Sequence, residues 1–532
     1  MNLVNLYEDG LRKFGEYDAC YFEGRWYTNT ELNRMASCLG NALKSLGVKK
    51  GDRVVTQLPN CVEIFVAFNA VYRIGAIIVP MNPILKPDQI SYIYQDCGAK
   101  AVITTSDYLP WINAAREKAP DLEHIILIDK NDVPETLYLG KLLQDSSDEC
   151  RIEDMENDDL AALIYTSGTT GNPKGVMHTH YTLWVNAVCF ADFQFLCAPT
   201  TVSNTVRQMD EKTHRMVETE QLVTGSNRDI LFLAVLPLSH SYGISFLNFG
   251  ALIGGRFAVM KWWNPAEALR LIQELKVGYI AFVPTMYIHL LDHPDLDKYD
   301  LSSLKFCACG AAALDPGIGL KWKEKVGVHI DEGWGMTESG ATTSGNPGYC
   351  PPKYGSIGIN MLACNKMSVV DMDDCELPPG ATGELVIKGA AVMKGYWNKP
   401  EETAETLKNG WLHTGDIGYR DDDGYFYITD RKKDLIIRGG ENISPKEVED
   451  VLSSHPGVAE AACIGIKDRV YGEVIKAFVV LKPGEKCSEQ DIIEHCGKSL
   501  PKFKTPRQVQ FIDALPKNIL GKMLRAELRK LE

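Results

Sequence analysis

Short apolar segments alternate with segments of helical spacing through the first part of the chain. Arg53–Leu58, Gly75–Pro80 and Ala101–Thr104 have the composition of buried strands. Val62–Tyr72 and Ile90–Gln95, which lie between them, have the length and spacing of helices. Because a strand, a helix and a second strand in succession form a parallel pair, the pattern predicts a parallel sheet.

The alternation extends toward residue 340, with two departures. Leu160–Tyr165, Ile230–Leu238 and Tyr279–Pro284 are predicted to be further buried strands. Residues 1–50 have amphipathic spacing and are predicted to be helical. Residues 193–229 mix Thr, Asn, Arg and Glu without a clear period, and we expect an irregular surface excursion there.

From about residue 350 the pattern changes to short strands separated by many turns. Met367–Asp371 and Gly383–Ile387 predict such strands, and Asp421–Ile428 predicts a hairpin with its turn at Asp422–Gly424. The β-rich part, at about residues 350–430, is therefore expected to form a small β-barrel or sheet.

The last hundred residues predict a compact α+β module. Ser444, followed by Pro445 and Glu447, is typical of a capped helix start. We place the domain boundary just before this region. The predicted fold is α/β, with an N-terminal domain of residues 1–430 and a smaller α+β C-terminal domain of residues 431–532.

Composition and charge exclude several classes of protein. The chain has 532 residues, too many for one core, which predicts at least two domains. Its net charge of −14 argues against nonspecific nucleic-acid binding, which needs a positive field. No run of about 18 apolar residues predicts a transmembrane segment, and the N-terminus has no signal-peptide pattern. The 15 cysteines lack metal-ligand spacing and fit reduced thiols, so we expect a cytoplasmic location.

The clearest candidate for chemistry is Tyr165–Val176, YTSGTTGNPKGV. Hydroxyls, glycines and one cation follow a predicted strand there, at the end where α/β folds bind ligands. Backbone N–H groups and hydroxyls of such a loop can surround a phosphate, and Lys174 adds a positive charge. The segment is not a Walker A loop, because its lysine is followed by a glycine instead of a serine or threonine.

Other polar residues lie near predicted strand ends. His240, between serines in PLSHSYG, predicts a partly buried imidazole that contacts a carboxylate, gates a pocket or is structural. Glu338 in DEGWGMTES is a candidate Mg²⁺ ligand, since Mg²⁺ prefers carboxylate oxygens. Asp416 in WLHTGDIG can accept both hydroxyls of a ribose. His178 and His180 have no further metal ligands nearby and are interpreted as structural.

In this order the motifs resemble those of the adenylate-forming superfamily of acyl-CoA synthetases, adenylation domains and luciferases. They are the phosphate loop, PLSHSYG, GWGMTES, GELVIKG, TGD, DRKKDLIIRGGENISP and a terminal Gly–Lys pair, and they span nearly the whole chain. The chain looks most like an acyl-CoA synthetase. The resemblance implies ATP, Mg²⁺ and coenzyme A as ligands, a small carboxylic acid as substrate, a mobile C-terminal domain and a homodimer as one possible assembly.

The resemblance also implies roles for matching residues. Lys522 would stabilise the transition state in which the carboxylate attacks the α-phosphate, and Thr337 would contact that phosphate. His240 would lie beside the acyl carboxylate, while Thr166 and Glu338 match the magnesium positions. The implied ATP and coenzyme A contacts are Thr166, Ser167, Gly168, Thr169, Thr170, Gly171, Lys174, Gly310, Ala311, Ala312, Glu332, Gly333, Trp334, Gly335, Met336, Asp416, Ile428, Arg431, Lys433, Arg438, Gly439 and Gly440.

A second step would transfer the acyl group to coenzyme A. The resemblance implies that the C-terminal domain rotates about Lys433, moves Lys522 away and brings Arg438–Gly440 over the pantetheine channel. Fatty, alicyclic and aromatic acids all stay open as substrates. Ser239 replaces an aromatic residue found in many relatives, which suggests a wider or more polar acyl pocket near the carboxylate.

Alternative functions are less consistent with the sequence. An adenylation enzyme for amino acids, which passes its product to a carrier protein, would need an acidic residue within 241–249, and none is present. A luciferase-like oxygenase has no support in the motifs. A non-catalytic nucleotide-binding relative would be expected to lack Lys522, Glu338 or Asp416, and all three are present.

Overall fold

The computed structural model describes residues 1–85, 87–166, 172–196, 202–209, 216–223, 230–347, 351–361, 364–431, 434–438, 441–517 and 523–531. The chain divides into two compact units. The first unit contains Met1–Lys366 and Lys388–Leu412, and the second contains Met367–Ile387 and His413–Glu532.

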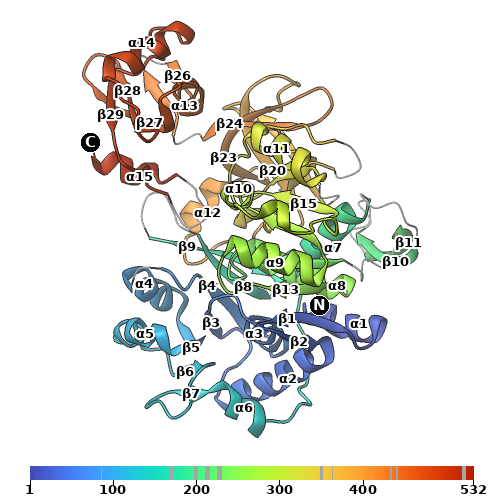
Figure 1. The fold of residues 1–532 in the computed structure, drawn as a ribbon. Helices are drawn as coiled ribbons and strands as arrows, with labels where there is room; N and C mark the ends of the chain where they lie inside the picture. Colours follow the sequence, from blue (N-terminus) through green and yellow to red (C-terminus); the bar gives the residue numbers. More distant parts are fainter. Residues whose placement is uncertain are drawn as a thin grey trace. The chain divides into compact units, whose positions relative to one another are not determined.

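An eight-stranded sheet in the first unit has the strand order β21-β9-β8-β4-β3-β5-β6-β7 (Figure 1). Its strands are β3 (Arg53–Gln57), β4 (Ile77–Met81), β5 (Ala99–Thr104), β6 (His124–Leu127), β7 (Leu137–Tyr138), β8 (Leu160–Thr166), β9 (Lys174–Thr179) and β21 (Gly395–Tyr396). The helices α3 (Val62–Arg73) and α4 (Pro87–Cys97) connect its first parallel strands. The predicted alternation of strand and helix is therefore confirmed, because these apolar strands are buried on both faces.

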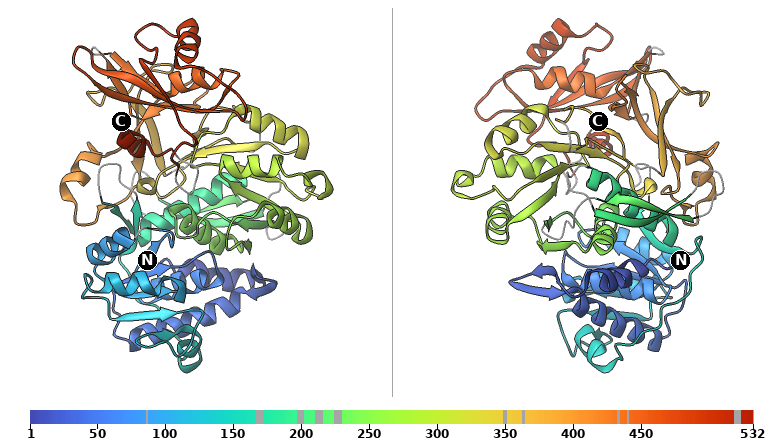
Figure 2. Two further views of the ribbon diagram at one scale, coloured as in Figure 1. Left: turned by 60° about the vertical axis from the view of Figure 1, so that its left-hand side comes forward. Right: turned by 90° about the vertical axis from the view of Figure 1, so that its right-hand side faces the viewer.

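A nine-stranded sheet in the same unit has the order β18-β17-β16-β15-β14-β12-β13-β1-β2. Its strands come from the N-terminal part of the chain, drawn in blue, and from the green and yellow parts (Figure 2). Its parallel core strands are β12 (Leu231–Ala234), β13 (Arg256–Val259), β14 (Val277–Phe282), β15 (Phe306–Cys309) and β16 (Ile330–Trp334). The helices α8 (Ser241–Ile253) and α9 (Pro265–Leu275) follow β12 and β13. The short strands β17 (Ser344–Gly345) and β18 (Ile359–Asn360) extend the sheet beyond β16.

The prediction that residues 1–50 are helical is wrong for the middle of this segment. Helices α1 (Asn5–Phe14) and α2 (Asn29–Ser45) flank a hairpin of β1 (Asp18–Phe22) and β2 (Arg25–Thr28). Its two turn residues both have positive φ, which suits the right-handed twist of a tight hairpin. β1 also pairs in parallel with β13, so a partner more than 200 residues away favours the strand over the helix.

The segment 193–229 also contains more regular structure than predicted. Helix α7 (His180–Leu196) runs into it, and β10 (Val202–Met209) pairs antiparallel with β11 (Met216–Val223) (Figure 1). Both strands mix β-branched and polar residues, a composition without the apolar run of a buried strand. The expectation of an irregular excursion is therefore wrong for these two strands.

The second unit carries two further sheets. One has the order β19-β20-β23-β22 with β24 beside β23, and the other has the order β26-β25-β28-β27 with β29 beside β28. The strands are β19 (Asn365–Val370), β20 (Gly383–Gly389), β22 (Leu407–Lys408), β23 (Trp411–Arg420), β24 (Phe426–Arg431), β25 (Ile436–Arg438), β26 (Glu441–Ile443), β27 (Val458–Asp468), β28 (Gly472–Leu481) and β29 (Gln508–Phe511). Strands β19, β20 and β23 extend at one end into segments that belong to the first unit, and β22 lies wholly in such a segment.

The predicted hairpin and helix cap of this region are present. β23 and β24 pair antiparallel on either side of the predicted turn. Ser444 caps α13 (Pro445–Ser453) by accepting a hydrogen bond from the Glu447 N–H, and α14 (Glu489–Ser499) packs with α13 in the apolar core beside β27 and β28. The α+β composition of the last hundred residues is therefore confirmed.

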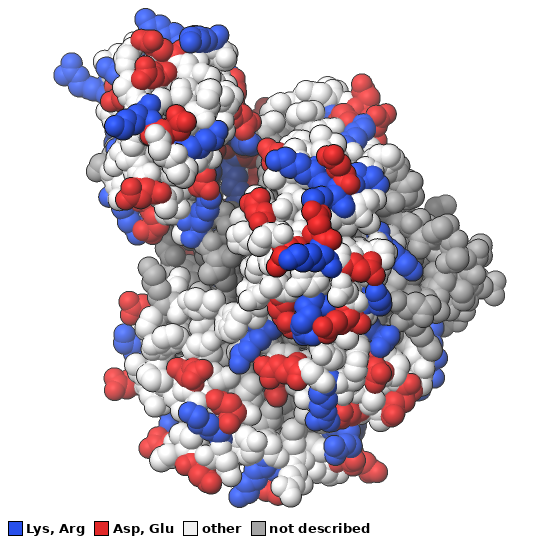
Figure 3. Space-filling model, in the orientation of Figure 1, with Lys and Arg blue, Asp and Glu red and all other residues white. Residues whose placement is uncertain are grey.

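Acidic and basic side chains are interspersed on the face shown in Figure 3. This mixture agrees with a net charge of −14 without a single basic patch on that face. Among the described residues, no helix combines the length and the hydropathy that a bilayer crossing requires.

Candidate active site

The hairpin of β8 and β9 brings the two ends of the predicted phosphate loop together. Thr166, the last residue of β8, lies opposite Lys174, the first residue of β9. The Lys174 ammonium lies 5.0 Å from the centre of the Tyr396 ring. The predicted loop residues Ser167, Gly168, Thr169, Thr170 and Gly171 lie outside the described residues.

Glu338 lies on a buried turn that follows β16. A short 3-10 helix (Thr337–Ser339) carries it, and the Glu338 side chain is 8% exposed. The Tyr396 hydroxyl donates a hydrogen bond to Glu338 Oε1 at 2.9 Å, and the Met393 N–H donates to the Glu338 carbonyl at 2.8 Å. The segment after β20 thus reaches this turn and joins Glu338 to Lys174 through one tyrosine.

Thr337 is held by two other elements. Its hydroxyl donates to Ser241 Oγ, at the start of α8, over 3.3 Å. Its carbonyl lies 2.7 Å from Nε2 of His178, a fully buried residue of β9. Burial lowers the pKa of His178 to about 4, so the imidazole is neutral near pH 7 and Nε2–H is the donor to the carbonyl.

His240 departs from its sequence prediction. It caps α8, where its Nδ1 accepts a hydrogen bond from the Tyr242 N–H at 3.4 Å, and the residue is exposed. A partly buried imidazole was the expectation, and that expectation is wrong. The loop between β12 and α8 leaves the helix start open to solvent, while Ser241, the next residue, is buried against Thr337.

The loops after β15 and β16 lie at one edge of the sheet. These strands are parallel, and Cys309 lies opposite Glu332. The predicted contacts Gly310, Ala311 and Ala312 follow β15; Glu332, Gly333 and Trp334 end β16; and Gly335 and Met336 follow it. A side chain at Gly310 would come within 3.3 Å of the Gly333 carbonyl, so the two loops lie close together.

Gly335 is required by its surroundings. A Cβ atom at this position would lie 1.6 Å from the Ala341 carbonyl oxygen, an overlap that no side chain can relieve. The backbone of the GWGMTES segment can therefore fold back tightly just before Thr337 and Glu338, which fixes where this turn begins.

Two acids of β16 are buried or half-buried. Glu332 is 5% exposed, and its Oε1 accepts a hydrogen bond from the Leu314 N–H at 3.1 Å. Burial raises the pKa of Glu332 to about 7, and it raises the pKa of the neighbouring Asp331 to about 7 as well. Buried acids that titrate near neutral pH at a strand end are frequent in functional sites.

In the second unit, Asp416 and Arg431 face each other across the β23–β24 hairpin. Arg431 Nε lies 3.0 Å from Asp416 Oδ1, and the Asp416 side chain is 5% exposed. Ile428 lies on the same hairpin, opposite Gly418. The structure thus brings together the two residues predicted to hold a ribose.

The turn before Asp416 is fixed by Glu384 of β20. Glu384 Oε1 accepts a hydrogen bond from the Gly415 N–H at 3.0 Å, and its Oε2 lies 3.2 Å from His413 Nδ1. The Thr414 hydroxyl donates to the Leu385 carbonyl at 2.6 Å. The GELVIKG motif therefore supports the TGD motif directly.

The remaining predicted contacts lie in the second unit or outside the described residues. The Arg438 guanidinium donates to the Phe503 carbonyl at 2.6 Å and lies 5.0 Å from the centre of the Tyr471 ring. Lys433, Gly439, Gly440 and Lys522 are outside the described residues.

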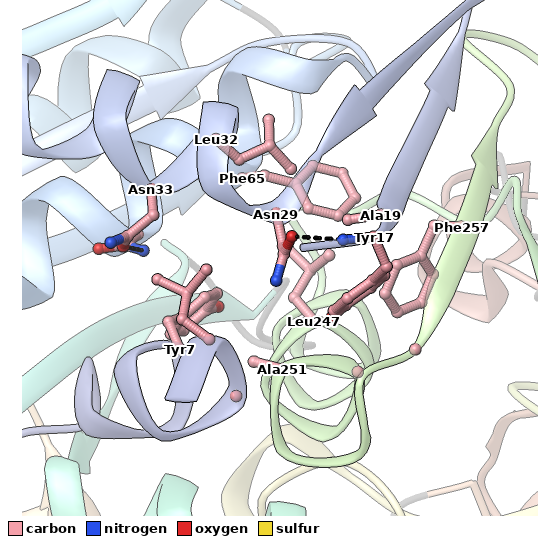
Figure 4. A pocket seen from close by; sticks show the side chains of 15 residues that line it. Tyr7, Tyr17, Ala19, Asn29, Leu32, Asn33, Phe65, Leu247, Ala251 and Phe257 are labelled. Atoms are coloured by element: carbon pink, nitrogen blue, oxygen red, sulfur yellow. Dashed lines mark hydrogen bonds between the residues drawn. The ribbon is translucent and has the colours of Figure 1, made fainter. Parts of the chain in front are cut away.

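A cavity in the first unit has a different location (Figure 4). Side chains of α1, α2, α3 and α8 line it together with Phe257 of β13. It contains none of the predicted site residues, and its α8 members, Leu247, Gly250 and Ala251, lie between the middle and the last turn of the helix, whereas His240 caps its start. This cavity is therefore separate from the candidate site.

Sequence reasoning missed the supporting residues. The sequence alone indicates no role for Tyr396, shows Glu384 only within a motif, and favours a structural role for His178 without identifying its partner. The contacts of Tyr396 and His178 join β9, β21 and the Glu338 turn, and those of Glu384 join β20 to β23. These segments are separated in the chain, so no local pattern contains the contacts.

Comparison with known proteins agrees with this geometry. Residues 7–397 match the AMP-binding enzyme family, and residues 447–522 match the AMP-binding enzyme C-terminal domain. The first match covers well over half of the chain. The protein therefore belongs to the AMP-binding enzyme family, and the prediction of an adenylate-forming enzyme is confirmed.

Individual relatives extend this finding over the full length. A long-chain-fatty-acid–CoA ligase of Bacillus subtilis is 33% identical, over all of this chain and 94% of the relative. A 4-coumarate–CoA ligase of Pinus taeda is 33% identical over 96% of this chain and 91% of the relative. The crystal structure of the anthranilate CoA ligase AuaEII with anthranoyl-AMP is 30% identical, with a TM-score of 0.84 over all of this chain and 97% of that one.

Proposed function

We propose that this acyl-CoA synthetase, an acid–thiol ligase, activates a long-chain fatty acid. Its reaction class follows from the family and from relatives that match along the whole chain. The observation that carries the site assignment is the cluster in the first unit, where the ends of the phosphate loop, Glu338 and Thr337 come together through β9.

The first half-reaction makes an acyl-adenylate. An oxygen of the substrate carboxylate attacks the α-phosphorus of ATP, and the bond to pyrophosphate breaks. Both reactants are anions, so cationic groups are needed to offset their repulsion. We assign this task to Lys174 and Lys522 and assign the contact with the α-phosphate to Thr337. Ser167, Gly168, Thr169, Thr170 and Gly171 would bind the leaving phosphates.

Thr166 and Glu338 fit a magnesium site. They offer a hydroxyl and a carboxylate oxygen, the hard donors that Mg²⁺ prefers, and the described residues contain no cluster of three or more His, Cys, Asp or Glu that would compete for a metal. Mg²⁺ usually takes one or two protein ligands and completes its shell with phosphates and water. When bound, it would neutralise the phosphate charge that develops during the attack.

The nucleoside contacts are assigned residue by residue. We assign the adenine to the loops around Gly310–Ala312 and Glu332–Met336, with Trp334 as a wall. We assign the ribose hydroxyls to Asp416, with Ile428 and Arg431 beside them. Asp416 is buried and already paired with a cation, which holds its carboxylate in one orientation for the neutral hydroxyls.

The second half-reaction forms the thioester. The coenzyme A sulfur attacks the acyl carbon, and AMP leaves. We assign the pantetheine path to Arg438, Gly439 and Gly440, with rotation of the C-terminal domain about Lys433 between the two steps. The domain boundary near residue 430 and a cytoplasmic location stay predictions.

The relatives favour a fatty acid over an aromatic one. Seven curated relatives from four bacterial genera are named long-chain-fatty-acid–CoA ligases, and they match 94–100% of this chain. Aromatic acids are the second candidate, because the 4-coumarate and anthranilate ligases match almost equally well. His240 and the loops at Gly310 and Gly335 would line the carboxylate end of either substrate.

A panel of acids tests the proposal. We would measure ATP–pyrophosphate exchange with fatty acids of increasing length, cinnamic and benzoic acids, and amino acids, and then add coenzyme A. Exchange with fatty acids, followed by coenzyme A-dependent AMP release, is expected. Exchange with aromatic acids alone would favour the second candidate, and exchange with no acid would contradict the proposed function.

A further inference from the structure

Tyr396 is fixed to the phosphate-loop hairpin by main-chain pairing. The short strand β21 pairs with β9, so Tyr396 lies opposite Val176, two residues after Lys174. Gly395, just before it, has φ +147, and a Cβ there would approach Thr403 Cγ2 to 2.8 Å. Only glycine suits this position, so the backbone places the tyrosine side chain in a defined direction.

The side chain of Tyr396 contacts two predicted site residues at once. Its hydroxyl donates to Glu338 Oε1 at 2.9 Å, and the Lys174 ammonium lies 5.0 Å from its ring centre. The residue itself is 8% exposed. Burial, followed by the negative charge of Glu338, raises the pKa of Tyr396, so the phenol keeps its proton and acts as a donor.

The backbone around Glu338 is anchored independently of this tyrosine. The Met393 N–H donates to the Glu338 carbonyl at 2.8 Å, and His178 lies 2.7 Å from the Thr337 carbonyl. Loss of the phenol hydroxyl would therefore leave the turn in place. What it would change is the direction in which the Glu338 carboxylate points.

We propose that Tyr396 is a positioning residue for adenylation, whose hydroxyl orients the Glu338 carboxylate and whose ring holds the Lys174 ammonium. The inference rests on the proposed function. A phenol is suited to this task because it fixes a carboxylate without neutralising its charge, whereas an arginine would compensate that charge. The carboxylate is thereby aimed while it keeps its attraction for a cation.

The first test replaces Tyr396 with Phe, which deletes the hydroxyl and keeps the ring. Fatty-acid-dependent ATP–pyrophosphate exchange is expected to fall roughly 10–100-fold, as for other residues that orient a metal ligand. The Mg²⁺ concentration for half-maximal exchange should rise, whereas thioester formation from supplied acyl-adenylate should stay within about threefold of wild type.

Tyr94→Phe is the matched control. Tyr94 is fully buried, its hydroxyl donates to the amide oxygen Oε1 of Gln57 at 2.7 Å, and neither residue is a predicted site residue. This control also loses a buried phenol hydrogen bond, so a decrease in melting temperature that both variants share reports structure alone. Its exchange rate and Mg²⁺ dependence are expected to match wild type.

Tyr396→Leu separates the ring from the hydroxyl. It removes both contacts, so the KM for ATP should rise severalfold above that of Tyr396→Phe, because Lys174 loses the ring that holds its ammonium. Equal KM values for the two variants would overturn the assignment of the ring to Lys174.

A double-mutant cycle tests whether Tyr396 acts through Glu338. If it does, the double variant of Tyr396→Phe and Glu338→Ala should exchange no more slowly than Glu338→Ala alone. The melting temperatures of the wild type, the two single variants and the double variant are then measured in EDTA without nucleotide. The decreases of the two single variants should not add up in the double variant, and this measurement needs neither metal nor catalysis. The inference would be overturned if the fold-losses in exchange rate of the two single variants multiply in the double variant, or if their decreases in melting temperature add.

The two failures can be told apart. Absence of exchange in the wild-type protein with every acid would contradict the proposed function, and the melting cycle would still decide whether Tyr396 and Glu338 are coupled. Wild-type exchange and Mg²⁺ dependence in Tyr396→Phe would overturn the positioning role while leaving the proposed function in place.

Discussion

Two buried carboxylates in this protein are held in opposite ways. Asp416 lies in the second unit, where Arg431 contacts it from the neighbouring strand of one hairpin. Glu338 lies in the first unit, where the hydroxyl of Tyr396 contacts it from a strand that is distant in sequence. One contact is ionic and local, and the other is neutral and long-range.

The two neighbours would suit the two carboxylates to different ligands. A guanidinium compensates the charge of Asp416, which suits a partner without charge, such as a pair of ribose hydroxyls. A phenol leaves the charge of Glu338 in place, which suits a cation beside phosphates. Under the proposed assignments, the neighbour of each carboxylate would thus separate two functions of the same chemical group.

The largest expected effect comes from Glu338→Gln, which removes the charge and keeps the shape. Fatty-acid-dependent ATP–pyrophosphate exchange should fall by about 10²–10³-fold, the usual loss when a group that stabilises transition-state charge is removed. Thioester formation from supplied acyl-adenylate should fall much less. Glu324→Gln, at an exposed position of a helix, is the control. A fall in the exchange rate of less than about fivefold would contradict the assignment of a cation-binding role to Glu338 and not to Asp416.

Glu332 sharpens the comparison, since it is a buried acid hydrogen-bonded by a backbone N–H group. Burial raises the pKa of Glu332 from its usual 4.5 to about 7. Between these two pH values the folded protein therefore keeps a proton that the unfolded chain releases. Its contribution to stability is therefore present below about pH 4.5 and is lost as the pH rises through about 7.

Glu332→Gln cannot release a proton and should avoid this loss. The difference in free energy of unfolding between Glu332→Gln and wild type should therefore shift in favour of the variant by about 3 kcal/mol from pH 4.5 to pH 8.5. Urea unfolding of both proteins at these pH values measures the difference, again with Glu324→Gln as the control. Parallel pH profiles for wild type and Glu332→Gln would contradict the assignment of a raised pKa.

Asp416→Asn tests the other side of the comparison. The KM for ATP should rise about 10–100-fold, as expected for loss of hydrogen bonds to a charged group, with kcat within about threefold. Steady-state kinetics with varied ATP measures both constants. Asp422→Asn, in the exposed turn of the same hairpin, should match wild type. A fall in kcat with an unchanged KM would argue against a role in ribose binding.

The smallest effect is expected for Arg431→Met. The Arg431 side chain is 39% exposed, so solvent screens its ion pair with Asp416, and the free energy of unfolding should fall by about 1 kcal/mol. The difference in free energy of unfolding between wild type and Arg431→Met should become smaller in 1 M salt, where the screening length is about 3 Å. Arg420→Met on β23 is the control, and a loss above about 3 kcal/mol would show that the pair behaves as a buried one.

Much of the fold could be predicted because burial leaves a local signature. β4 and β12 are continuous apolar runs, β8 is apolar up to its last residue, and β3 contains a buried Val–Val pair, so all four are predicted from the sequence. The β1–β2 hairpin was missed, since β1 depends on a parallel partner in β13. β10 and β11 were missed because their mixed polar composition lacks the apolar run of a buried strand.

The site shows the same division. Asp416 and Arg431 could be predicted as a pair from their motifs, and the turn between them made their register local. The exposure of His240 could not be predicted, because it depends on how a loop enters α8. The contact of Tyr396 with Glu338 could not be predicted either, because it arises when β21 joins a sheet whose other strands precede residue 180.

Adenylation and thioester formation are proposed to use different residues of one chain, and the variant Lys522→Ala separates the two half-reactions. We would measure ATP–pyrophosphate exchange with a fatty acid and coenzyme A thioester formation from supplied acyl-adenylate in this variant. We expect exchange to be abolished and thioester formation to be retained. Equal loss of both half-reactions would contradict the proposed division of roles.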